Sequence, residues 1–262
     1  MDKNIHLLII DPQNDFCIPE GSLYVDGAEK DMGRLTSFID KNMGNISRIT
    51  VTLDSHKNYH IANPIFWIDE EGKHPQPFTI ITSNDVDTGR WQATNSIHRS
   101  WSINYVKTLE KKGRYQLCIW PYHCIIGTKG NNIFNSLAEI IRVYEIEHKG
   151  IVEYIIKGSN SLTEHYSALF ADVPIPDDVS TQINKSLLVS MAESETIYVA
   201  GEALSHCVAN TILDIGTCLN SDLSKFTLLQ DATSSVKGFE HLSDNFIYTA
   251  KKMGLKFRYT TD

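Results

Sequence analysis

Five short apolar runs constrain the fold of this chain more than any other feature of its sequence. Ile, Val and Leu dominate these runs without regular polar alternation, and polar or turn residues bound each of them. Strands of this composition occur where a parallel sheet is covered on both faces. We therefore predict buried strands at residues 6–10, 49–53, 152–156, 196–200 and 225–229.

Helices are expected between these strands, at residues 29–42, 131–144, 180–192, 206–221 and 238–253. Alternation of strands and helices predicts a doubly wound α/β fold with right-handed crossovers. The expected architecture is a mostly parallel sheet of about six strands with helices on both faces, in three α/β/α layers. We expect a single domain over residues 1–262.

Residues 61–119 interrupt this alternation. They contain several Pro and Gly residues together with Trp67, Trp91 and Trp101. The segment is too long and too aromatic for a linker, so we interpret it as an ordered insertion. It could cap a pocket, form an interface in a homo-oligomer, or be a surface excursion with a small core of its own.

Charge and composition argue against several classes of partner. The formal net charge is -8 with no Lys/Arg block, which disfavours nucleic acid, and no apolar stretch approaches the ~18–20 residues of a membrane span. The N-terminal apolar run is too short for a signal peptide. Five cysteines without a CxxC pair fit a reducing compartment. We expect a cytoplasmic protein that binds neither nucleic acid nor membrane.

Polar residues follow the first predicted strands, where an open parallel sheet binds its ligands. Asp11 comes directly after the first run, and Asp54 and His56 come directly after the second. Asp-x-His offers a carboxylate and an imidazole on one side of an extended segment, a donor set for zinc, iron or manganese. His123 is a candidate third ligand. Taken singly, Asp11 could be a turn or cap residue, and the histidines could be incidental loop residues.

Two further residues have chemistry that their positions favour. Lys157 ends an apolar strand, which is unusual without a carboxylate partner, although a lysine at a sheet rim can also snorkel. Cys207 begins a predicted helix after a turn of small residues. Free N–H groups and the helix dipole favour a thiolate there, so we predict a pKa for Cys207 below the free value of ~8.5. The alternative is a buried packing cysteine.

Together these segments resemble the isochorismatase-like cysteine hydrolases, in their nicotinamidase branch. The matching segments are DPQNDFC at 11–17, DSHKNYH at 54–60, WPYHC at 120–124, KG at 157–158, GEALSHCV at 201–208 and DAT at 231–233. They occur in the family's order and span most of the chain. The resemblance implies the isochorismatase-like form of the three-layer fold.

The resemblance also implies roles for individual residues. It implies a catalytic triad of Asp11, Lys157 and Cys207. It implies one divalent metal ion, zinc in the first place with iron or manganese as alternatives. The ligands that it implies are Asp54, His56 and His123, with His60 as a candidate fourth.

Four substrate-binding residues follow from the same resemblance. Phe16 and Trp120 match the aromatic residues that enclose a pyridine ring, and Ala203 follows a peptide bond that is cis in the family. Leu204 departs from the hydroxyl residue common at its position, and Glu202 departs from the usual Val. These departures bear on the identity of the substrate more than on the type of reaction.

The implied activity is hydrolysis of nicotinamide to nicotinate and ammonia through a thioester on Cys207, a step in the salvage of pyridine nucleotides for NAD biosynthesis. Two alternatives stay open. One is a related cysteine hydrolase that acts on another small amide or carbamoyl substrate. The other is a catalytically silent binding protein on the same fold.

Overall fold

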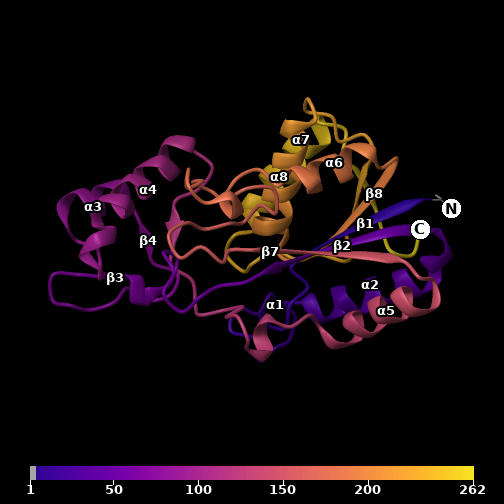
Figure 1. Ribbon diagram of the computed structural model, residues 1–262, viewed down its shortest axis with the longest axis horizontal. Helices are drawn as coiled ribbons and strands as arrows, with labels where there is room; N and C mark the ends of the chain where they lie inside the picture. The colour runs from indigo at the N-terminus through magenta and orange to yellow at the C-terminus, as the bar shows by residue number, and fades with distance from the viewer. Residues whose placement is uncertain (1–3) are drawn as a thin grey trace.

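The computed structural model describes residues 4–262, and a six-stranded sheet forms its centre (Figure 1). All neighbouring strands of this sheet are parallel, in the order β10-β9-β8-β1-β2-β7. The strands are β1 (Ile5–Ile10), β2 (Ile46–Asp54), β7 (Ile151–Lys157), β8 (Thr196–Gly201), β9 (Phe226–Leu229) and β10 (Lys256–Arg258). This arrangement confirms the predicted doubly wound α/β fold.

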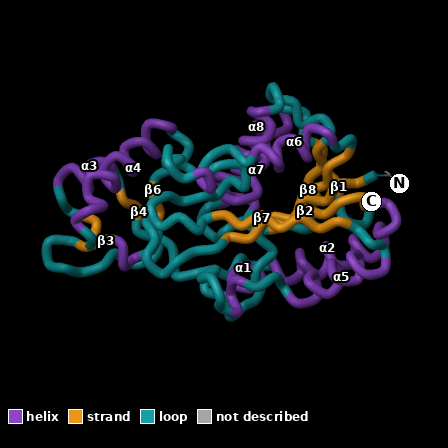
Figure 2. The backbone as a smooth tube through the Cα atoms, in the orientation of Figure 1, coloured by secondary structure: helices purple, strands orange, loops and turns teal. Residues whose placement is uncertain are grey.

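Helices cover both faces of this sheet. Figures 1 and 2 show α2 and α5 together on one face, and α6, α7 and α8 on the other. The helices around the sheet are α1 (Asn14–Cys17), α2 (Ala28–Asn42), α5 (Asn135–Glu147), α6 (Lys185–Glu193), α7 (Ala209–Cys218) and α8 (Glu240–Lys252). Asn184 caps α6 through a bond to the Leu187 N–H, so that helix starts later than predicted. The other predicted helices shift by a few residues at their ends.

The segment 61–119 lies beyond the carboxyl ends of the central strands (Figure 1). It contains two small antiparallel pairs, β3 with β5 and β4 with β6, and two helices. Its elements are β3 (Trp67–Ile68), β4 (Ile80–Ile81), α3 (Ser83–Thr88), β5 (Gln92–Ala93), α4 (Arg99–Lys112) and β6 (Leu117–Cys118). Trp67 and Tyr105 are fully buried, so the segment has apolar packing of its own at the end of the sheet where ligands bind.

The edge strand β7 differs from the prediction that all five runs are covered on both faces. Ile151, Tyr154 and Ile156 are exposed on this strand, whereas Ile155 and Lys157 are buried. The reason is its place at the edge, where β2 is its only neighbouring strand within residues 4–262. The register of that pair sets Asp54 opposite Lys157.

The remaining strand, β10, was not predicted because it has only three residues and two of them are charged. No helix within residues 4–262 is long and apolar enough to cross a membrane.

His6 is a buried polar residue in the central strand β1. Its Nδ1 lies 2.8 Å from the Ser194 Oγ, and its Nε2 lies 2.8 Å from the Thr50 Oγ1. Burial, helped by the nearby Arg48, lowers the pKa of His6 to about 4. The folded protein therefore keeps this ring neutral at pH values where a free histidine is protonated.

We expect the free energy of unfolding to decrease as the pH is lowered from about 6.5 to 4, because only the unfolded chain binds a proton at His6 in that range. The shift corresponds to a loss on the order of 3 kcal/mol. Urea unfolding at several pH values would measure it. In His6→Gln the free energy of unfolding should depend less on pH by a matching amount, whereas the control His148→Gln, at an exposed position, should keep the parental pH dependence. An unchanged slope in His6→Gln would contradict the assignment.

Candidate active site and metal centre

Four buried side chains meet beyond the carboxyl ends of four adjacent strands. Asp11 follows β1, Asp54 ends β2, Lys157 ends β7, and Cys207 lies in the turn after β8. Each of them is at most 6% exposed. Parallel strands bring their carboxyl ends to one edge of the sheet, which explains how residues from such distant parts of the sequence come together.

Lys157 is the centre of this group. Its Nζ lies 2.8 Å from Asp11 Oδ2, 3.2 Å from Asp54 Oδ1 and 3.6 Å from Cys207 Sγ. Thr52 orients Asp11 further, since its hydroxyl donates to Asp11 Oδ1 over 2.5 Å. The structure therefore brings the three residues of the implied triad into contact around one ammonium group.

Burial and the neighbouring charges shift the pKa values of this group in opposite directions. Burial alone would lower the pKa of Lys157, but Asp11, Asp54 and Cys207 outweigh it and hold its pKa well above the usual range. Burial raises the pKa of Asp11, although Lys157 works against that rise. Lys157 is therefore held as a cation, and Asp11 has an increased affinity for a proton.

The predicted low pKa of Cys207 is wrong for this structure. Burial raises the pKa of its thiol well above the free value, and Asp11 and Asp54 add to the rise, so the opposing effect of Lys157 is not sufficient. Cys207 lies within a wide helical turn, Leu204–Val208, rather than at the first free N–H of the helix. In the free protein the sulfur is a thiol that needs a base before it can attack.

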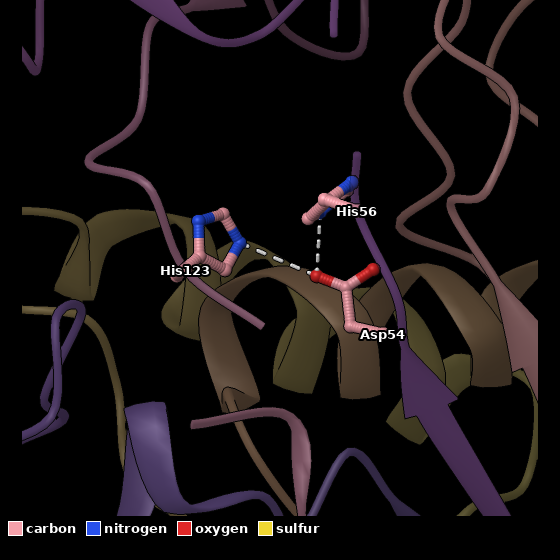
Figure 3. A group of neighbouring side chains, drawn as sticks. All are labelled: Asp54, His56 and His123. Carbon is pink, nitrogen blue, oxygen red and sulfur yellow. Dashed lines mark hydrogen bonds and ion pairs between the residues drawn. The ribbon is translucent and has the colours of Figure 1, made fainter. Parts of the chain in front are cut away.

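Asp54, His56 and His123 form a second group, which shares Asp54 with the first. Figure 3 shows the two imidazole rings next to the Asp54 carboxylate. His56 Nε2 lies 2.8 Å and His123 Nε2 3.3 Å from the same carboxylate oxygen, Asp54 Oδ2. The other ring nitrogens lie 3.2 Å and 2.8 Å from the main-chain carbonyls of Gly158 and Pro121. A carbonyl only accepts, so each Nδ1 carries a hydrogen, and each Nε2 faces the carboxylate, where a proton or a metal ion can lie between them.

This geometry fits a divalent cation. Two lone pairs facing an anion repel it unless a proton or a metal ion lies between them. Burial would lower the pKa of His56, yet Asp54 and Glu164 raise it to about 9, which shows how strongly the site attracts positive charge. One carboxylate and two imidazoles whose tautomers are fixed from behind form a donor set for zinc, iron or manganese.

His60 is buried against His56, with ring centroids 4.4 Å apart. Its Nε2 lies 3.1 Å from the Thr163 carbonyl, and its Nδ1 accepts from the Ala62 N–H. Both nitrogens have main-chain partners, so its assignment as a fourth ligand stays a prediction that would need one of these bonds to break.

Glu164 was not singled out in the sequence, and it faces the same site. Its Oε1 lies 3.8 Å from His56 Nε2, and its Oε2 is buried without a hydrogen-bond partner. It follows Lys157 by seven residues in a loop without regular secondary structure, so no periodic pattern could have indicated it. The carboxylate adds negative charge beside the metal-binding group.

Aromatic rings adjoin both groups. Phe16 packs against His123 at 5.4 Å between centroids, and Trp120 packs against His206 at 5.2 Å. Phe239, which the sequence did not indicate, lies 5.7 Å from Trp120. Phe16 is therefore next to the candidate metal ligands, while Trp120 is next to the residue that precedes Cys207.

Hydrogen bonds between Glu202, Ser234 and Leu204 hold the turn that carries Cys207; we call this set of bonds the clamp. Glu202 is fully buried, and its Oε2 accepts from the Ser234 N–H over 3.0 Å. The Ser234 carbonyl in turn accepts from the Leu204 N–H over 2.8 Å. The peptide bond between Glu202 and Ala203 is cis. Ala203 is buried and Leu204 is half-buried. These two of the four predicted substrate-binding residues lie on the same turn as Cys207.

Comparisons with known proteins agree with these observations. No family model matches the chain. Among curated proteins, a nicotinamidase of Saccharomyces cerevisiae is 26% identical over 207 residues, which are 79% of this chain and 79% of that protein.

Solved structures share the fold over nearly the full length. The yeast nicotinamidase Pnc1p bound to the inhibitor nicotinaldehyde superposes with a TM-score of 0.66 at 18% identity, covering 97% of this chain and 99% of that one. A nicotinamidase/pyrazinamidase of Acinetobacter baumanii gives 0.65 at 23%, covering 100% and 99%. The pyrazinamidase of Pyrococcus horikoshii in complex with zinc gives 0.57 at 19%, covering 98% and 99%.

Replacement of Glu202 tests the clamp on the Cys207 turn. Burial and the neighbouring Asp31 raise the pKa of Glu202 well above the usual range, which favours its uncharged form, so the uncharged and equally large side chain of Glu202→Gln should keep nearly full stability. Glu202→Ala should lose about 2 kcal/mol or more, because it leaves a cavity and an unpaired Ser234 N–H. Urea unfolding would measure both, with the exposed Glu195→Ala as control. Equal stability of the Ala and Gln variants would contradict the clamp.

Proposed function

We propose that the chain is a member of the isochorismatase-like cysteine hydrolases, in their nicotinamidase branch, and that it hydrolyses nicotinamide to nicotinate and ammonia. One observation carries the proposal: Asp11, Lys157 and Cys207 are in contact at the same edge of the sheet as the Asp54–His56–His123 group. The first set supplies a nucleophile with a base, and the second supplies a place to hold a pyridine nitrogen.

In the first half of the reaction, Asp11 takes the proton of the Cys207 thiol. The thiolate attacks the carboxamide carbon, and a carbon–sulfur bond forms. The carbon–nitrogen bond then breaks, and the nitrogen leaves as ammonia with the proton that Asp11 returns. Because burial raises the pKa of both Asp11 and Cys207, the carboxylate remains a base of useful strength for this thiol.

In the second half, water replaces sulfur. Asp11 takes a proton from water, whose oxygen attacks the thioester carbon, and the carbon–sulfur bond breaks. The departing sulfur recovers a proton, and nicotinate leaves. Lys157 lies 2.8 Å from Asp11 and 3.6 Å from Cys207, so its charge stabilises the anionic form of each in turn. The main-chain N–H groups near Ala203 and Cys207 are proposed to hold the developing oxyanion.

Substrate orientation is proposed to depend on the second group. Asp54, His56 and His123 would hold one divalent ion, with zinc as the first candidate and iron or manganese as alternatives. When bound, the ion supplies a contact, direct or through water, that orients the pyridine nitrogen. Phe16 and Trp120 enclose the ring, and Ala203 and Leu204 contact the carboxamide side.

Location and pathway are part of the proposal. All five cysteines are free, which supports a reducing compartment such as the cytoplasm. Conversion of nicotinamide to nicotinate there serves the salvage of pyridine nucleotides for NAD biosynthesis. The homo-oligomeric state stays a prediction.

A related amidase that acts on another small amide or carbamoyl group is the second candidate. Leu204 favours it, because this half-buried apolar side chain stands where relatives commonly carry a hydroxyl. A silent binding protein is the weaker alternative, because Asp11, Lys157 and Cys207 are all present and in contact. Ammonia release from a panel of amides would separate the three.

Cys207→Ala should abolish ammonia release from nicotinamide, by roughly 10³-fold or more, because it removes the thiol that lies 3.6 Å from the Lys157 Nζ and is proposed to form the thioester. Circular dichroism should show an unchanged fold. The matched control is Cys218→Ala, which removes an exposed cysteine and should keep parental activity. Substantial turnover by Cys207→Ala would reject Cys207 as the nucleophile.

His123→Ala should reduce bound metal roughly tenfold or more, because it removes one of three protein ligands. Elemental analysis of purified protein would measure the metal content independently of activity. His148→Ala, an exposed histidine in a separate part of the chain, is the control. If His123→Ala retains the parental metal content, His123 is not a ligand.

A further inference from the structure

A cavity of about 340 Å³ lies apart from the catalytic residues, and its size is within the range of small-molecule sites. Three separate elements form it: the end of α4 with the residues that follow, the loop after β7, and the second half of α7. Tyr115 forms part of its wall and packs against Tyr166, whose hydroxyl accepts from the Trp120 indole N–H over 2.7 Å. One layer of aromatic rings therefore separates this cavity from the nucleophile turn.

The walls combine an apolar surface with one available cation. Leu109, Tyr115 and Phe170 supply the apolar part. Arg114 is paired with Asp214 over 2.8 Å, so its charge is already balanced. Lys112 donates to the main-chain carbonyl of Asp172 and forms no salt bridge among residues 4–262. Its charge acts on the Asp172 carboxyl group only from a longer distance, so Lys112 presents an ammonium group without a close ion-pair partner to the cavity.

Asp172 provides a second, independent indication of a ligand. It lines the cavity and is 7% exposed, and its Oδ2 is buried without a hydrogen-bond partner, whereas Oδ1 accepts from the Tyr115 hydroxyl. A buried polar atom without a partner is costly, and a ligand group can satisfy it. A ligand carboxyl group would satisfy both Lys112 and Asp172. It offers a negative charge to the Lys112 ammonium group, and it can form a hydrogen bond with the Asp172 carboxyl group through one proton carried by either carboxyl.

The cavity is connected to the nucleophile turn by hydrogen bonds. Arg114 Nη1 donates to Asn210 Oδ1 over 3.0 Å, and Asn210 Nδ2 donates to the His206 carbonyl over 2.8 Å. His206 directly precedes Cys207. A ligand that displaces Arg114 would therefore change the contact that holds this carbonyl.

We propose that this cavity is an effector site for a small monocarboxylate with a flat apolar body, held by Lys112 and Asp172 and linked to the Cys207 turn through Arg114 and Asn210. The binding part of this inference does not rest on the proposed activity. Nothing in the catalytic group contributes to the site.

Cys218 offers a direct readout, because it lines the cavity and is the one exposed cysteine within residues 4–262. The probe is 2-naphthoate, with 2-acetylnaphthalene as its neutral isostere. We expect 2-naphthoate to slow alkylation of Cys218 severalfold, measured by mass spectrometry, and the neutral isostere to protect much less. Unchanged alkylation with 2-naphthoate, or equal protection by both compounds, overturns the site.

A pair of neighbouring lysines provides the matched variants. Lys112→Met removes the charge that the ligand needs and should weaken protection by about tenfold or more, whereas Lys111→Met, one position earlier on α4, should leave it unchanged. Asp172→Asn should weaken protection as well. Equal protection in Lys112→Met and the parent contradicts the assignment of Lys112.

The effector role is tested by ammonia release from nicotinamide. Saturating 2-naphthoate should change kcat or KM at least twofold in the parent and in Lys111→Met, but not in Lys112→Met. An identical kinetic effect in Lys112→Met would place the compound at the catalytic site and overturn the effector role. Protection of Cys218 without any kinetic change would also overturn the effector role. Failure of the proposed nicotinamide reaction would leave the alkylation result intact.

Discussion

The charge of one buried lysine organises the active end of this molecule. An ammonium group that loses its water is costly by several kcal/mol unless anions compensate for it. Asp11 and Asp54 supply that compensation at 2.8 Å and 3.2 Å from the Lys157 Nζ. In the proposed reaction the same two carboxylates also serve the chemistry, one beside the thiol and the other beside the histidines. Stability and function therefore depend on the same ion pairs, and neither aspartate can be removed without exposing the other groups to an unbalanced charge.

Much of the fold could be predicted from the sequence because its strongest signals are local. An apolar run such as residues 6–10 specifies a buried strand whatever surrounds it, and all five predicted runs are strands. The residue directly after such a run lies at the ligand-binding edge, which explains why Asp11, Asp54 and Lys157 could be singled out. Where the strand is short or lies at an edge, the local signal fails, as it did for β10 and for the exposed face of β7.

The other differences arise from tertiary structure. The pKa of Cys207 depends on how deeply the sulfur is buried and on carboxylates that come from other strands, and neither is visible in a helix-start pattern. Glu164 and Phe239 reach the site from irregular segments without periodicity. The partners of His60 are main-chain groups whose positions only the folded loop determines. Motif similarity can name residue types at a site, but the partners of each atom require coordinates.

The pairing of β2 with β7 has an evolutionary consequence. Asp54 faces Lys157 across this pair, and no strand of the described residues lies on the other side of β7 to hold its alignment. A slip by one residue would turn the lysine toward the opposite face of the sheet and leave both aspartates without their cation. Selection for catalysis at one end of β7 is thus selection for fidelity of strand alignment along its whole length. The exposed residues Ile151, Tyr154 and Ile156 can therefore be substituted during evolution only by residues that preserve the alignment of β7 with β2.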